Sequence, residues 1–129
     1  MPKLEAAIPA QGTAGTAQDY VIGECDSGGT VKEVTIVPEA AVTGNATNYR
    51  NFRVINKGQS GAGSTVVATF ATSATPANDL VAFDEKSLTL SGTAANLVVA
   101  EGDVLVADET VAATGVAHGG YTIKVIYQA

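Results

Sequence analysis

The sequence alternates between short runs of β-branched or aromatic residues and stretches rich in glycine, proline, asparagine and aspartate. Two such runs close the chain, at 97–106 and 121–127, and a glycine-rich stretch lies between them. Short runs of this composition, bounded by turn formers, are typical of β-strands. We therefore interpret the last third of the chain as strands that fold back on one another. The stretch at 110–120 between the two main strands is too long for a tight hairpin, so we expect it to reach across the fold or to touch a neighbouring molecule.

The same pattern begins at residue 19, with turn formers at intervals of about 8–12 residues, as in sandwiches and barrels. Runs at 19–24 and 31–37 flank the turn sequence Asp-Ser-Gly-Gly and predict a hairpin. In the run at 49–56, a period of two places Phe52 and Val54 on the buried face. Further strands are expected at 64–72, 80–83, 86–90 and 104–108, with Val66, Ala68, Phe70, Leu88 and Leu90 facing the core.

About eight short strands and almost no helix predict the fold class. We expect an all-β protein, a single antiparallel β-sandwich or jelly-roll-like barrel, because 129 residues allow one core. Residues 1–18 mix proline, alanine and glycine without a period and are interpreted as an extended N-terminal arm. Residues 19–129 then form the β-sandwich domain. Since only 5% of residues are aromatic, we expect a thin core that gains stability from subunit contacts.

Charge and hydropathy indicate which kinds of partner the chain does not bind. A net charge of −6 with only seven basic residues argues against direct nucleic-acid binding, which depends on lysine and arginine. No apolar stretch approaches the length of a signal-peptide core or a membrane span, so we expect neither export by such a signal nor membrane contact. Cys25, the single cysteine, is interpreted as a small buried hydrophobe rather than a reactive thiol.

Side chains that carry chemistry are scattered along the chain. His118 is the only histidine, is expected to be exposed in a loop, and has no second nitrogen for a metal site or triad. Asp103 follows a glycine at a strand entrance, where it is expected to accept backbone hydrogen bonds rather than bind calcium. The glycine-rich segment 58–63 lacks the Lys-Ser/Thr of a phosphate loop. We predict no catalytic, cofactor or metal site, and no enzyme.

One basic concentration stands out in this acidic chain: Arg50, Arg53 and Lys57. Two interpretations remain open at this point. These residues are solvated charges that discourage aggregation of an edge strand, or they form a docking patch for an acidic protein surface, including a second copy of the chain. Together with the apolar Leu4 and Ile8 of the arm, they are the predicted partner-binding residues.

The segments 48–58, 65–69, 101–105 and 119–125 resemble small structural proteins of tailed bacteriophages, nearest the capsid decoration, or cement, proteins. The similarity covers about residues 19–127, and no catalytic residues carry over. The resemblance implies a β-rich virion protein, typically a homotrimer, that is assembled in the host cytoplasm. On the capsid exterior it binds the major capsid protein and stabilises the shell by bridging its subunits.

A second class of function remains an alternative: a glycan- or receptor-binding β-sandwich of a phage head fibre or tail. Sugar sites usually present aromatic platforms. Here the candidates are Tyr20, Tyr49, Tyr121 and Tyr127, with no tryptophan. A hydrolase would need a catalytic constellation that the sequence does not contain.

Overall fold

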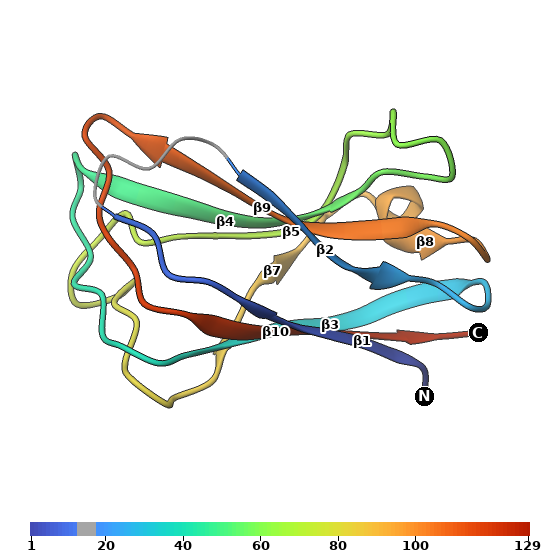
Figure 1. Cartoon of the computed structure of the whole chain (residues 1–129), viewed down its shortest axis with the longest axis horizontal. Helices are drawn as coiled ribbons and strands as arrows, with labels where there is room; N and C mark the ends of the chain where they lie inside the picture. Colours follow the sequence, from blue (N-terminus) through green and yellow to red (C-terminus); the bar gives the residue numbers. More distant parts are fainter. Residues whose placement is uncertain (13–17) are drawn as a thin grey trace.

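The computed structural model describes residues 1–12 and 18–129 as two antiparallel sheets packed face to face (Figure 1). The first sheet has the order β1-β10-β3-β6, with β8 also pairing with β3, and the second has the order β2-β9-β4-β5-β7. The predicted all-β fold is confirmed. The strands are β1 (Lys3–Ile8), β2 (Gln18–Glu24), β3 (Gly29–Pro38), β4 (Tyr49–Asn56), β5 (Thr65–Ala71), β6 (Lys86–Ser87), β7 (Thr89–Leu90), β8 (Val98–Val99), β9 (Val104–Ala112) and β10 (Tyr121–Gln128), and a 3-10 helix, η1, spans Ala94–Leu97.

The predicted hairpin of β2 and β3 is wrong, because the two strands lie in different sheets: β2 pairs with β9 and β3 pairs with β10. Completely buried Cys25 follows β2, and its backbone exchanges hydrogen bonds with Gly102 and Asp103 rather than with β3. The closing strands β9 and β10 also belong to opposite sheets, so they do not fold back on one another. The long segment between them carries the chain across the sandwich.

A β-bulge explains why β3 does not alternate cleanly. Glu33 and Val31 pair with consecutive residues of β10, which leaves Lys32 as the extra residue. Such an extra residue changes which alternate side chains face the core. Val31 faces inward before the bulge, and Val34 and Ile36 do so after it.

Three further strand predictions need correction. A register shift in β5 buries Val67, whereas Val66 and Phe70 are only half-buried. The run at 86–90 is one segment that changes sheets: β6 pairs with β3 and β7 pairs with β5. Buried Leu88 lies between β6 and β7, so this segment closes one side of the core. Residues 80–83 form only an isolated bridge, from Leu80 to Val42.

The expected N-terminal arm is instead part of the sandwich where it is described. β1 pairs with β10 along its whole length, and Ile8 is buried. The Leu4 side chain fills the space beside Gly23 of β2, since a Cβ there would lie 3.1 Å from Leu4 Cδ2. The reason for the difference is the alternation of Leu4, Ala6 and Ile8, which gives β1 one apolar face. Residues 13–17 of the predicted arm lie outside the described residues.

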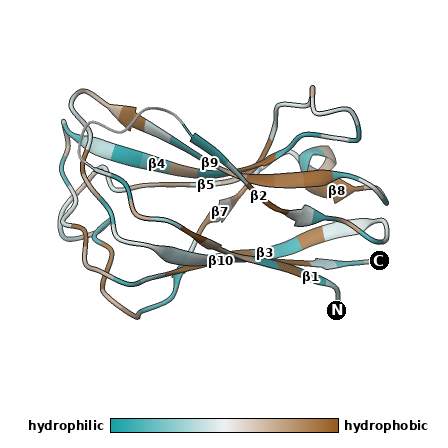
Figure 2. Cartoon of the chain, in the orientation of Figure 1, coloured by the Kyte–Doolittle hydropathy of each residue, from teal (hydrophilic) through white to brown (hydrophobic). Residues whose placement is uncertain are grey.

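The core lies between the sheets and consists mainly of valine, isoleucine and leucine side chains. In Figure 2 brown, hydrophobic segments alternate with white and teal segments along the strands, and brown also appears in the loop at the bottom of the view. The prediction that Cys25 is a small buried residue is confirmed, and burial raises the pKa of its thiol. Within the described part of the chain, no helix is long and apolar enough to cross a membrane.

Candidate functional site

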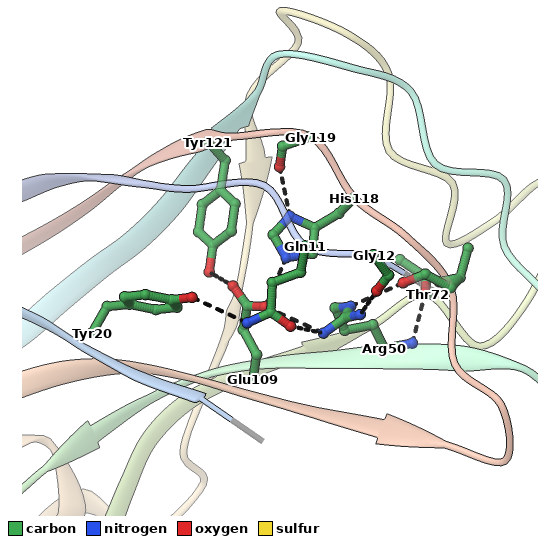
Figure 3. A network of polar contacts seen from close by, with 10 residues as sticks. Gln11, Gly12, Tyr20, Arg50, Thr72, Glu109, His118, Gly119 and Tyr121 are labelled. Carbon is green, nitrogen blue, oxygen red and sulfur yellow. Dashed lines mark hydrogen bonds and ion pairs between the residues drawn. The ribbon is translucent and has the colours of Figure 1, made fainter. Parts of the chain in front are cut away.

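A cluster of buried polar side chains lies at one end of the sandwich, where several connections cross between the sheets (Figure 3). Arg50 comes from β4 and Glu109 from β9 of one sheet, and Tyr121 comes from β10 of the other. His118 lies in the connection just before β10. Arg50 and Glu109 are fully buried, so this cluster is the most unusual feature of the interior.

Strand periodicity places both charged side chains inside. Arg50 shares its face of β4 with Phe52 and Val54, which are core residues. On β9, Glu109 continues the inward row of Leu105 and Ala107. The period of two therefore carries an arginine and a glutamate into positions that otherwise hold apolar side chains.

The carboxylate of Glu109 has three polar side-chain partners. The Tyr121 hydroxyl donates to Oε2 at 2.6 Å, and His118 Nε2 lies 2.7 Å from Oε1. Arg50 Nη1 donates to Oε1 at 3.4 Å. A buried carboxylate is costly unless its oxygens are paired in this way.

Both ring nitrogens of His118 face oxygen atoms. Nδ1 contacts the carbonyl oxygen of Gly119, which can only accept, and Nε2 contacts Glu109. Both ring nitrogens of His118 are therefore engaged with oxygen atoms of the protein. The side chain is only 2% exposed, which corrects the expectation of an exposed loop histidine. The reason for the difference is the buried carboxylate of Glu109 on β9, which the ring contacts.

Arg50 connects two segments at the end of the sandwich to its own strand, β4. Its Nε donates to the carbonyl oxygen of Val116 at 3.0 Å. Its Nη1 donates to Gln11 Oε1 at 3.0 Å, and its Nη2 donates to the carbonyl oxygen of Gly12 at 3.0 Å. The guanidinium thus ties the segment after β1 and the segment before β10 to β4.

Aromatic packing encloses the carboxylate. The rings of Phe52 and Tyr121 meet edge to face, with centroids 5.4 Å apart, and His118 meets Phe52 at 5.5 Å. Burial raises the pKa of Tyr121 far above its ordinary value, and the Glu109 carboxylate raises it further. Tyr121 is therefore a neutral hydrogen-bond donor at any physiological pH.

This arrangement resembles the histidine–carboxylate pair of a general base, but its geometry is closed. Both nitrogens of His118 are engaged and the ring is buried, so no face of it is open to a substrate. Among the described residues, every buried polar side-chain atom has a hydrogen-bond partner. The cluster has the properties of a structural clamp, which we call the Arg50–Glu109 clamp.

The three basic residues of the predicted docking patch do not form one patch. Arg50 points into the interior, which removes it from any surface, as burial removes Ile8. Arg53 points outward and binds Asp108 at 2.7 Å, while Lys57 lies 3.5 Å from Asp19. β4 lies between β9 and β5, so the interpretation of these residues as charges on an edge strand is also wrong.

The turn before β9 agrees with its prediction. Asp103 Oδ2 accepts hydrogen bonds from the Ala100 amide at 2.9 Å and from Asn56 Nδ2 at 3.0 Å. These bonds lower the pKa of Asp103, and Gly102 supplies the left-handed backbone of the turn with φ of +89°. Within residues 1–12 and 18–129, no group of three His, Cys, Asp or Glu side chains is placed to hold a metal ion.

The candidate sugar platforms are mostly internal. Tyr121 and Tyr127 are buried, and Tyr20 and Tyr49 are half-buried. Tyr20 accepts a hydrogen bond from Gln11 at 3.1 Å, and is therefore part of the surroundings of the clamp.

The chain has no match among protein-family models, curated proteins or solved structures.

Proposed function

We propose that this chain is a non-catalytic structural protein, a capsid decoration protein that binds the exterior of a phage head. The observation that carries the proposal is the Arg50–Glu109 clamp. The histidine, the buried arginine and the buried glutamate are all used to hold the ends of the two sheets together. This use of the three side chains supports a structural role for the cluster.

The architecture suits a protein that must bear load. β1 is hydrogen-bonded to β10, so the described N-terminal residues stabilise the body and do not hang from it. The clamp fixes the segments around Gly12 and Val116 to β4 at the same end of the sandwich. We propose that such a body bridges major capsid protein subunits as a homotrimer, as the resemblance to cement proteins implies.

Binding to empty shells tests this function. Expanded shells, assembled from the major capsid protein encoded in the same genome, are mixed with the purified full-length chain and sedimented. We expect saturable, stoichiometric co-sedimentation and a higher temperature of shell disruption. The proposal would be contradicted if the shells sedimented without bound chain at every ratio of chain to shell. It would also be contradicted if the chain bound but the disruption temperature stayed the same.

The full chain is required in this test. Removing residues 1–18 would delete β1 and the Gln11 and Gly12 contacts of Arg50, so lost binding would reflect lost folding. A glycan array run with the same protein addresses the alternative function. A reproducible glycan hit without shell binding would replace the capsid proposal with a receptor-binding one.

A further inference from the structure

The loop between β5 and β6 exposes large apolar side chains at its end. Phe83 is 78% exposed and Val81 is 57% exposed. The loop ends at Lys86, which pairs with Ile36 of the neighbouring strand β3. The next residue of β3, Val37, also has an exposed side chain. We call residues 81–85 the Phe83 loop. Apolar side chains gathered on a surface in this way commonly mark a site of protein interaction.

The backbone holds Phe83 in this exposed position. Its φ is +63°, a left-handed conformation that is rare for a bulky side chain. The Phe83 amide donates to the carbonyl oxygen of Pro38 at 2.7 Å, and the Asp84 amide donates to that of Val81 at 3.1 Å. Two hydrogen bonds therefore fix the loop to the end of β3 while its aromatic ring stays in solvent. Strained residues of this kind often occur at functional positions.

A half-open hollow of about 390 Å³ adjoins the loop. Its apolar lining includes Pro76, Leu80 and Val81. Three carboxylates, those of Asp79, Asp84 and Glu85, contribute to its lining, together with a single lysine.

The charge in this hollow is unbalanced. Its lysine, Lys86, is turned to the Phe70 ring, with Nζ 5.0 Å from the ring centroid. Asp79 Oδ1 accepts a hydrogen bond from the Gly44 amide at 2.7 Å, which fixes that carboxylate in place. The hollow therefore combines apolar walls for an aliphatic stem with negative charge for a cationic head.

We propose that the Phe83 loop and this hollow form a docking surface for a protein segment that presents a lysine or arginine beside an apolar side chain. The cationic side chain enters the hollow, its stem lies against Leu80 and Pro76, and Phe83 packs on the neighbouring apolar residue. An aromatic anchor with adjacent charge is a common centre of binding energy and of electrostatic steering. This inference rests on the proposed function, because it names the surface with which a protein-binding chain would contact its partner.

Three variants separate this surface from the fold. Phe83→Gly removes the ring, and glycine adopts the left-handed backbone without cost, so the loop keeps its shape. Asp84→Asn with Glu85→Gln removes two of the three negative charges while keeping the side-chain size. Val98→Ser is the matched control, because Val98 is 57% exposed on β8, at the opposite end of the sandwich (Figure 1).

The probe is a library of short random peptides, selected on the full chain with counter-selection on Phe83→Gly. We expect the enriched peptides to pair lysine or arginine with a leucine or aromatic residue. Their affinity should fall about tenfold or more in Phe83→Gly. It should also fall in the Asp84/Glu85 variant, with a weaker salt dependence, and stay unchanged in Val98→Ser. Enrichment of neutral or acidic peptides only, or equal affinity for wild type and Phe83→Gly, would overturn the inference.

The same variants distinguish the two proposals. If shells bind wild type and Phe83→Gly equally, the capsid function holds and the docking surface is wrong. If cationic peptides bind in a Phe83-dependent manner but shells do not bind, the surface holds and the capsid function is wrong.

Discussion

Strands β4 and β9 carry two arginine–carboxylate pairs on opposite faces. On the inner face, Arg50 and Glu109 lie 3.4 Å apart and both side chains are completely buried. On the outer face, Arg53 and Asp108 lie 2.7 Å apart, with side chains 34% and 13% exposed. The two pairs come from the same strands and the same residue classes. They differ in what surrounds them.

The inner pair has the longer contact, yet we expect it to contribute more to the stability of the fold. Removing two charges from water is expensive, and the inner pair offsets that cost with further hydrogen bonds to Gln11, His118 and Tyr121. The outer pair keeps contact with solvent, where an ion pair contributes little even at short range. The number of hydrogen-bond partners and the burial of a pair, rather than the distance between its charges, set its importance for stability.

The largest expected effect comes from Arg50→Met. The substitution keeps much of the side-chain volume but removes the donors to Val116, Gln11 and Gly12, and removes the arginine from its ion pair with Glu109. Breaking a buried pair in this way costs about 3–5 kcal/mol. We expect the free energy of unfolding, measured by urea denaturation, to fall by this amount.

A second variant shows how much of the loss comes from a buried Glu109 carboxylate that no longer has its arginine. In Arg50→Met with Glu109→Gln, the buried negative charge is absent, so we expect part of the stability to return. If the single variant lost less than about 1 kcal/mol, the inner pair would behave as a surface pair and the comparison would fail.

Tyr121→Phe should have an intermediate effect. It removes the 2.6 Å hydrogen bond to Glu109 while keeping the ring that packs on Phe52. Loss of one donor to a buried carboxylate costs about 1–3 kcal/mol at neutral pH. Urea unfolding at pH 7, compared with wild type, measures it.

The same variant changes the pH dependence. The folded protein keeps the Tyr121 proton, since its pKa is strongly raised, whereas the unfolded chain loses it near pH 10. The free energy of unfolding therefore falls as the pH rises above about 10, by up to about 1.4 kcal/mol per pH unit for this group. We expect Tyr121→Phe to fall less steeply. The variant should still lose some stability as the pH rises, because the pKa values of Cys25 and Tyr127 are also raised in the folded protein. An unchanged slope would contradict the assignment.

The sequence predicts individual strands better than their partners. The predicted run at 49–56 coincides with β4, because its alternation and flanking turn formers are local signals. The turn after β2 carries an equally local signal, but a turn does not say whether its flanking strands pair or enter opposite sheets. The bulges at Lys32 and in β5 also shift the alternation without a sequence signal that the period of two can detect.

The sequence predicts the burial of Arg50 but not its pairing with Glu109. A strict period of two from Phe52 and Val54 places Arg50 on the buried face, and this signal was present in the sequence. Its partner Glu109 lies 59 residues away, one residue beyond the predicted end of the strand at 104–108. Since an arginine is seldom buried without a partner, the pairing becomes visible only when β4 and β9 lie side by side.

The smallest expected effect belongs to the outer pair. Arg53→Met and Asp108→Asn are combined in a double-mutant cycle, which isolates the interaction between the two side chains. Asp108 lies beside Asp19 in the register of β2 and β9. Burial and the Asp19 carboxyl raise the pKa of Asp108, although Arg53 acts in the opposite direction. The cost of burying Asp108 beside Asp19 therefore offsets part of the attraction between Asp108 and Arg53. We expect a coupling energy of about 0–1 kcal/mol that weakens in high salt. A coupling as large as the loss in Arg50→Met would show that the two faces of this strand pair are not energetically different.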